Sequence, residues 1–68
     1  MNEETLNLSL RKFLKTVGVN SQRDIEQAVA KAIEDGTLKG NEAFPAQMRL
    51  VVGKLALDVV FDGEIRLE

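Results

Sequence analysis

Apolar residues recur with a helical period near the start of the chain. They predict a helix over residues 2–17, because the i, i+4, i+7, i+8 and i+11 spacing of one helix face is occupied by Leu6, Leu10, Phe13, Leu14 and Val17. Asn2 can cap the N-terminus of this helix through its side-chain oxygen. Gly18 is typical of a helix C-terminus, because glycine adopts the left-handed conformation at little cost. The pattern therefore predicts that the first helix ends at Gly18.

A second apolar stripe follows after a short link. It predicts a helix over 22–35, with Ser21 as N-cap and Gly36 as stop, and its apolar positions are Ile25, Ala28, Val29, Ala32 and Ile33. So short a link favours an antiparallel or steeply crossed pair of helices. Over residues 36–46 the periodic signal disappears, and glycine and proline predict a loop.

Beyond residue 46 the apolar residues alternate with a period of two, which is typical of strands that cover one face. The alternation predicts strands over 47–52, 55–60 and 64–68. A two-residue turn at Gly53-Lys54 keeps the apolar residues of the first two strands on one face. A three-residue loop ending in a left-handed Gly63 does the same for the last two. The sequence therefore predicts an α+β fold, α-α-β-β-β, with a two-helix hairpin packed on one face of a three-stranded antiparallel meander.

The composition describes one small globular domain over residues 1–68. The chain has 68 residues, of which 44% are hydrophobic and 29% charged, and its formal net charge is -2. It has no Cys or His, which excludes disulfides, the usual zinc and haem ligation, and nucleophilic catalysis by Cys or by a His-activated Ser. No apolar stretch is long enough to cross a membrane, and the first residues do not resemble a signal peptide. We therefore expect a cytoplasmic protein without cofactor or metal.

No group of residues predicts an active site. The candidate general acids or bases are three carboxylates near the end of the second predicted helix: Glu34, Asp35 and Glu42. Neighbouring acids at a helix end are usually solvated surface. On the outer sheet face, the predicted register places Arg49 opposite Asp58, and Asp58 opposite Arg66. This arrangement is either cross-strand charge pairing, which we favour, or an anion-binding cluster, and we predict that the protein is not an enzyme.

One helix surface suggests a protein partner. Leu8 points away from the apolar stripe of the first helix and lies among basic residues, so the candidate surface consists of Leu8, Arg11, Lys12 and Lys15. An apolar residue among cations can dock on an acidic partner, although single exposed leucines are common. A weaker candidate patch on the outer sheet face consists of Val51, Ala56 and Val60. The leading function is therefore a small non-enzymatic protein-interaction or structural module, with a protein partner or a weak homodimer.

A nucleic-acid-binding regulator of winged-helix-like organisation is the alternative function. Residues 13–29 loosely resemble a helix-turn-helix, and the predicted β-hairpin would serve as the wing. The second helix, however, is net acidic, with Asp24, Glu26, Glu34 and Asp35 against Arg23 and Lys31. Such a helix would repel phosphates, so nucleic-acid binding is not the favoured function.

Short segments along the whole chain carry a family resemblance. They are Asn2 to Asn7, Arg11 to Lys15, Val17 to Arg23, Leu38 to Glu42 and Asp62 to Ile65. Together these segments resemble a family of short bacterial proteins that is classed as a domain of unknown function. The resemblance implies a free-standing bacterial cytoplasmic protein. It implies no activity, cofactor or site residue, so the functional expectations depend on the residues themselves.

Overall fold

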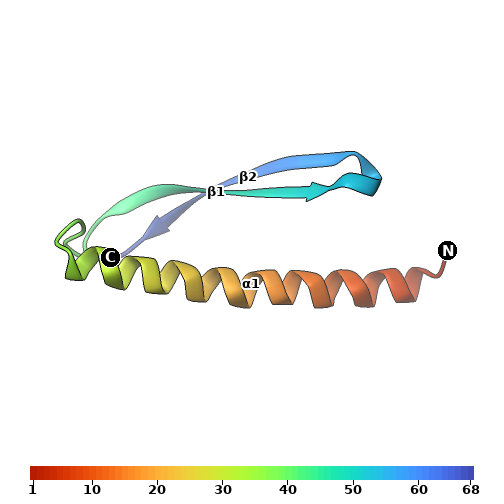
Figure 1. Ribbon diagram of the computed structural model, residues 1–68, viewed down its shortest axis with the longest axis horizontal. Coiled ribbons are helices and arrows are strands. Elements are labelled where there is room, and N and C mark those ends of the chain that lie inside the picture. Colours follow the sequence, from red (N-terminus) through yellow and green to blue (C-terminus); the bar gives the residue numbers. More distant parts are fainter. The chain divides into compact units, whose positions relative to one another are not determined.

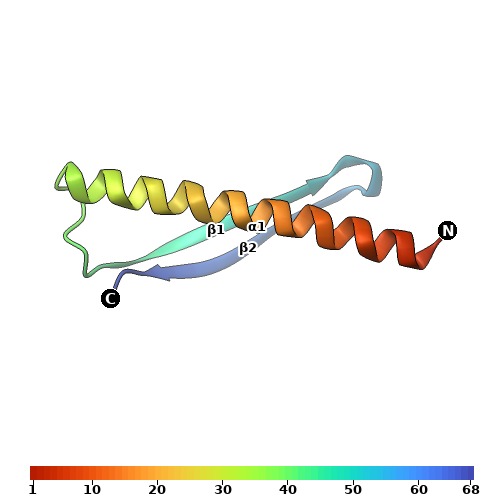
Figure 2. The ribbon, with the colours of Figure 1, turned by 90° about the horizontal axis from the view of Figure 1, so that it is seen from below.

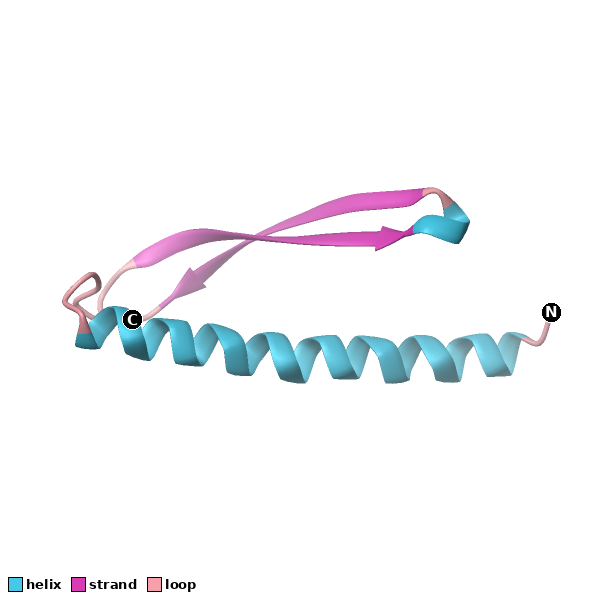
Figure 3. Ribbon diagram, viewed as in Figure 1, coloured by secondary structure: helices cyan, strands magenta, loops and turns pink.

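The computed structural model describes residues 1–68 and contains one long helix followed by a two-stranded antiparallel sheet (Figure 1). Its elements are helix α1, Glu3–Glu34, strand β1, Ala43–Val52, the short 3-10 helix η1, Gly53–Leu55, and strand β2, Leu57–Arg66. Figure 3 shows η1 within the connection between the two strands. The chain forms two compact units, Met1–Thr37 and Leu38–Glu68, and the single domain expected over its whole length stays a prediction.

Helix α1 replaces the two helices predicted over 2–17 and 22–35. Gly18 lies in its interior, where glycine costs about 1 kcal/mol relative to alanine but does not force the helix to end. The apolar stripe also passes through this region in phase, because steps of four residues connect Val17, Ser21 and Ile25. The residues of the predicted link therefore continue the helix, and the prediction of Gly18 as a stop is wrong.

The two ends of α1 follow the sequence signals. The side chain of Asn2 accepts a hydrogen bond from the backbone N–H of Thr5 at 3.1 Å, which confirms the predicted N-cap. Acidic residues occupy the first turn, where the helix dipole stabilises negative charge. At the other end α1 stops at Glu34, and Gly36 adopts a positive φ of 82°, which glycine tolerates without strain.

The second unit contains two strands rather than three (Figure 2). Strand β1 begins at Ala43, inside the loop predicted over 36–46. Strand β2 runs without interruption through Gly63, which lies opposite Ala46 and does not have a positive φ. The strands predicted over 55–60 and 64–68 are therefore one strand. The α-α-β-β-β prediction is wrong, and the fold is a helix followed by a β-hairpin.

The turn of the hairpin contains four residues instead of the predicted two. Val52 is paired with Leu57, and within the turn the N–H of Ala56 donates to the carbonyl of Gly53 at 3.1 Å. Ala56 has a φ of 50°, in the left-handed region. The longer turn shifts every predicted cross-strand pair by two residues. Because two is the period of a strand, the apolar residues that remain in the strands still share one face, while Leu55 moves into the turn.

No residue of the chain is buried. The apolar stripe of α1 stays largely exposed, with Phe13 at 50% and Ile25 at 39%. On the hairpin Met48 is 45% exposed, whereas most of the other apolar strand residues are half-buried. The helix and sheet faces that the sequence assigns to a core therefore remain accessible to solvent. This exposure is unusual for a chain with 44% hydrophobic residues, and it directs the search for function to the surfaces of the two units.

Candidate interaction surfaces

The register of the hairpin separates apolar from polar side chains. Successive residues of a strand point to opposite faces, and one face collects Phe44, Ala46, Met48, Leu50, Val52, Leu57, Val59, Phe61, Gly63 and Ile65. We call these ten residues the apolar sheet face. None of these residues is buried, but only Met48 and Phe61 have large exposed side chains, at 45% and 56%, and most of the others are half-buried. An isolated two-stranded hairpin is marginally stable at best in water, so this face is one that a partner could stabilise.

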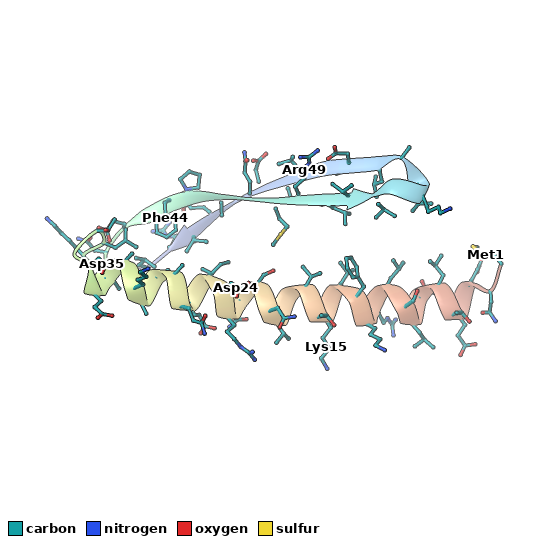
Figure 4. The ribbon with its side chains drawn as sticks, viewed as in Figure 1. Met1, Lys15, Asp24, Asp35, Phe44 and Arg49 are labelled. Carbon is teal, nitrogen blue, oxygen red and sulfur yellow. The ribbon has the colours of Figure 1, made fainter.

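The opposite face of the hairpin, the polar sheet face, carries a two-point ion pair. Nε and Nη2 of Arg49 donate to the two carboxylate oxygens of Asp58 at 2.9 and 2.6 Å (Figure 4 labels Arg49). The predicted contact is thus present, but it is diagonal, because Arg49 is paired with Val60 and Asp58 with Val51. The hydrogen bonds from Arg49 lower the pKa of Asp58, and the same bonds raise the pKa of Arg49.

The predicted pairing of Asp58 with Arg66 within the sheet is wrong. Arg66 lies opposite Ala43, at the end of β2 far from the turn. Its Nη1 atom is 3.8 Å from Oε1 of Glu64, and both side chains are more than half exposed. One chain therefore does not place a carboxylate between two guanidinium groups, and it does not form the anion-binding cluster that the sequence left open.

The patch predicted on the outer sheet face is only partly formed. Val51 and Val60 both belong to the polar sheet face, where they are 59% and 49% exposed. The Arg49–Asp58 ion pair runs along the other diagonal of the same four residues. Ala56 lies in the turn and not in either strand. The outer face thus offers two valines beside an ion pair, not a continuous apolar patch.

The carboxylate of Glu42 organises the loop that precedes β1. It accepts hydrogen bonds from the backbone N–H groups of Lys39 at 3.1 and 2.9 Å, Gly40 at 3.0 Å and Asn41 at 3.2 Å. These bonds, that from Lys39 above all, lower the pKa of Glu42. Gly40 has a φ of 106°, which lets the backbone wrap around the carboxylate. Glu42, a candidate acid or base in the sequence, thus has a structural role in its own loop.

The basic surface predicted on the first helix is present on α1. Leu8, Arg11, Lys12 and Lys15 follow the i, i+3, i+4, i+7 spacing of one helix face. Figure 4 shows the side chain of Lys15 extending outward from the helix. Leu8 is 59% exposed, but Leu14 of the apolar stripe is exposed to the same fraction. Exposure alone therefore does not distinguish Leu8, and its role in binding stays a prediction.

The continuity of α1 joins the two predicted apolar stripes into one. Steps of four, four and three residues connect Leu6, Leu10, Leu14, Val17, Ser21, Ile25, Ala28 and Ala32. This eleven-residue repeat corresponds to about 3.67 residues per turn, close to the helical value, so the stripe stays nearly straight along the helix. Sequence reasoning missed this repeat because it treated residues 18–21 as a link. The signal that could have revealed it is the shared phase on both sides of Gly18.

The helix-turn-helix that the sequence suggested has no support in the fold. Residues 13–29 are continuous helix, so the helix-turn-helix that suggested nucleic-acid binding is not formed. Nowhere does the chain bring together three or more Asp, Glu, His or Cys residues in a way that could hold a metal ion. Despite its length, α1 is not apolar enough over any stretch to cross a membrane.

Comparison with known proteins identifies a family and nothing more specific. A family model described as "Family of unknown function (DUF6494)" matches residues 1–68. This match confirms the resemblance to a family of unknown function. No curated protein and no solved structure matches the chain.

Proposed function

We propose that this chain, which belongs to the family of unknown function DUF6494, is a non-enzymatic protein-interaction module. The observation that carries the proposal is the apolar sheet face, whose ten positions lie on one side of the hairpin without a single buried side chain. Contiguous exposed apolar surface on a small protein commonly marks an interaction site. The hairpin is the part of the chain that gains most from being covered.

The expected gain from covering the apolar sheet face is large for a small chain. Burying one Val, Leu, Ile, Phe or Met side chain contributes about 1.5–3 kcal/mol relative to full exposure. Met48 and Phe61 lie opposite each other in the register, and they are 45% and 56% exposed. A partner that covers these two side chains would therefore stabilise the hairpin, and the same burial would stabilise the complex.

Helix α1 offers a second contact of different chemistry. The basic surface of Leu8, Arg11, Lys12 and Lys15 combines one exposed apolar side chain with three cations. Charges around an apolar contact orient a partner and accelerate association. The partner that fits this surface carries an acidic patch with an apolar centre.

The test compares substitutions on the two faces of the hairpin. Phe61→Lys places a charge on the apolar sheet face, and Val60→Lys places the same charge one residue away on the polar sheet face. Sedimentation velocity over a wide concentration range measures self-association, and capture from an extract of the source cells measures binding to other proteins. Because the chain has no Trp or Tyr, interference optics should replace absorbance at aromatic wavelengths. Circular dichroism verifies that each variant keeps its secondary structure.

We expect Phe61→Lys to lose association and Val60→Lys to keep most of it. Leu8→Asp, tested in the same way, assigns any remaining contact to α1. A native chain that stays monomeric at the highest concentration and retains no protein from the extract would disprove the proposal. Equal retention by the native chain, Phe61→Lys and Leu8→Asp would contradict the assignment of the binding to these surfaces, because neither would then carry it.

A further inference from the structure

The hydrogen bond at the open end of the hairpin shows which backbone groups of β2 face away from β1. The N–H of Leu67 donates to the carbonyl of Glu42 at 2.9 Å, and these residues continue the register that pairs Ala43 with Arg66. Hydrogen-bonded pairs alternate along an antiparallel ladder. The odd-numbered residues of β2 therefore bond to β1, and the outward N–H and C=O groups belong to Asp58, Val60, Asp62, Glu64 and Arg66.

The two open edges of the hairpin are not equivalent. By the same alternation the outward residues of β1 are the odd-numbered ones, and one of them is Pro45. Proline has no N–H, so the outer edge of β1 cannot support a continuous ladder. Every outward residue of β2 keeps its N–H. Strand β2 is thus the edge on which another strand can add over its full length.

We propose that two copies of the chain pair through their β2 strands, antiparallel, with the twofold axis at Asp62. The two hairpins then form one four-stranded sheet in the order β1-β2-β2-β1. A self-complementary contact of this kind closes as a dimer and does not propagate. The inference rests on the proposed function, because it names a second copy of the chain as the partner.

Charge selects this register on the polar sheet face. With the axis at Asp62, Asp58 lies opposite Arg66 of the second copy, and this ion pair occurs twice by symmetry. Asp58 then lies between Arg49 of its own chain, already bonded at 2.9 and 2.6 Å, and the second guanidinium that one chain does not supply. The only like charges placed directly opposite each other are those of Asp62 and its own copy, and Gln47 already donates to that carboxylate at 2.9 Å.

Neighbouring registers are disfavoured by the same charges. A shift of two residues in one direction places Asp58 opposite Glu64 of the second copy, and a shift in the other direction places Asp62 opposite Glu64. Each of these like-charge contacts occurs twice, and like charges directly opposite destabilise a strand pair. A shift of one residue would set the apolar sheet face of one hairpin against the polar sheet face of the other.

The apolar sheet face supports the register independently of charge. With the axis at Asp62, Leu57 and Val59 lie opposite Leu67 and Ile65 of the second copy, and Phe61 lies opposite Gly63 of the second copy. Gly63 has no role in a turn, its φ is not positive, and a Cβ built on it meets no atom within 4 Å. A glycine inside a strand often marks a close approach by another group, and an aromatic side chain across the strand pair compensates for it. In the proposed pairing, Phe61 of the second copy is the aromatic side chain that lies opposite Gly63.

A disulfide test reads the register directly, because the chain has no cysteine. Asp62→Cys places two cysteines across the axis with Cα atoms about 5.5 Å apart, within the range of a disulfide. Val60→Cys and Glu64→Cys are matched controls on the same strand and face. In the proposed register each control cysteine lies about 14 Å from its copy, four residues along the strand and one strand across. The full-length variants are oxidised in a glutathione buffer, and covalent dimer is followed on a non-reducing gel.

We expect covalent dimer to form about tenfold faster or more for Asp62→Cys than for either control. Equal rates for the three variants, or a faster control, would overturn the register. Edge pairing itself is tested with Val60→Pro, which removes an N–H that points away from β1. The control is Val51→Pro, which removes the equivalent outward N–H from the edge of β1. We expect Val60→Pro to sediment as a monomer at concentrations where Val51→Pro and the native chain are dimers.

The outcomes separate this inference from the proposed function. A native dimer that persists in Val60→Pro would place the interface on another surface, which overturns the β2 pairing and leaves the interaction module intact. A native chain that is monomeric but binds another protein through the apolar sheet face would likewise overturn the β2 pairing and leave the interaction module intact. A monomer that binds nothing would overturn both.

Discussion

Helix α1 and the β1–β2 hairpin complete their backbone hydrogen bonds in different ways. Inside α1 each N–H bonds to the carbonyl four residues earlier, so the helix interior needs nothing from outside. In the hairpin each strand is bonded on one side only, and both outer edges stay open. The hairpin therefore has open strand edges that the helix lacks, and both units carry apolar residues that are not buried. Association should accordingly affect the hairpin more than the helix.

The largest expected effect tests whether α1 is one continuous helix. Gly18→Pro removes a hydrogen bond inside the helix and clashes with the carbonyl of Leu14, which should cost about 3 kcal/mol and a large part of the helical circular dichroism signal. Glu3→Pro is the matched control, because Glu3 is the first residue of α1 and proline is tolerated at that position. Similar small effects of both substitutions would mean that the helix ends near Gly18.

The hairpin turn should show the next largest effect. Ala56 holds a φ of 50°, and a β-branched side chain resists the left-handed region more than alanine does. Ala56→Val should therefore destabilise the hairpin by on the order of 1 kcal/mol beyond the cost that alanine already carries at this φ. Urea unfolding, followed by the amide signals of β1 and β2, measures the change. Ala56→Gly is the control and should stabilise the hairpin, so a neutral result for both variants would contradict the four-residue turn.

Gly18 and Gly63 show how much of the fold the sequence predicts. The apolar period, the Asn2 cap and the faces of the strands follow from local chemistry, and the structure agrees with them. The sequence predicts that elements end at Gly18 and Gly63, because glycine permits a left-handed conformation. Glycine permits this conformation but does not require it, and neither residue has a positive φ. The apolar period keeps its phase across both residues. The alternation of Leu57, Val59, Phe61 and Ile65 continues through Gly63 just as the helical stripe continues through Gly18.

The candidate surfaces were less predictable than the elements. The shared face of Leu8, Arg11, Lys12 and Lys15 depends only on helical spacing, which α1 provides, and their role in binding stays a prediction. The Arg49–Asp58 contact is present although the predicted register is wrong, because an arginine side chain can reach a diagonal neighbour. The predicted contact between Asp58 and Arg66 is not formed. The last two predicted strands are one strand, so Arg66 lies at the end of β2 far from the turn. Long-range register depends on the turn, and Gly53-Lys54, which predicts a two-residue turn, lies instead within a turn of four residues.

A smaller effect with an informative sign is expected at Gly18. If Gly18 were a left-handed helix stop, alanine there would be destabilising. In a continuous helix, Gly18→Ala should stabilise α1 by about 1 kcal/mol, because alanine loses less backbone entropy. Thermal unfolding monitored by the helical signal measures this change. A decrease in stability would restore the interpretation of two helices.

Gly63→Val separates the stability of the hairpin from its self-association. A left-handed Gly63 predicts a loss of more than about 1 kcal/mol for this substitution. Within a strand, valine instead favours the extended conformation and should stabilise the hairpin by a few tenths of a kcal/mol. In the proposed dimer the same side chain occupies the space beneath Phe61 of the second copy. We therefore expect Gly63→Val to stabilise the hairpin in urea and to weaken the dimer in sedimentation, and a gain in both would contradict the pairing at Gly63.

Acidification should loosen the hairpin unit gradually. The pKa of Glu42 is lowered from its ordinary value of 4.5, chiefly by the Lys39 N–H, and that of Asp58 is lowered from 3.8 by Arg49. A carboxylate with a lowered folded-state pKa contributes stability that is fully present above its unfolded value and lost as the pH falls through its folded value. The loop before β1 and the Arg49–Asp58 contact should thus weaken only below the ordinary values.

Amide chemical shifts followed from neutral to strongly acidic pH measure this transition. The N–H signals of Lys39, Gly40 and Asn41 should move together, since all three donate to one carboxylate. Glu42→Gln should remove the acid-induced change in that loop and leave the change near Arg49, while Asp58→Asn should do the reverse. Loop signals that still titrate in Glu42→Gln would show that another group holds the loop. Independent titrations would mean that Glu42 stabilises the open end of the hairpin and Asp58 the region near the turn, each without the other. The helix, whose backbone groups bond to one another, does not depend on a carboxylate in this way.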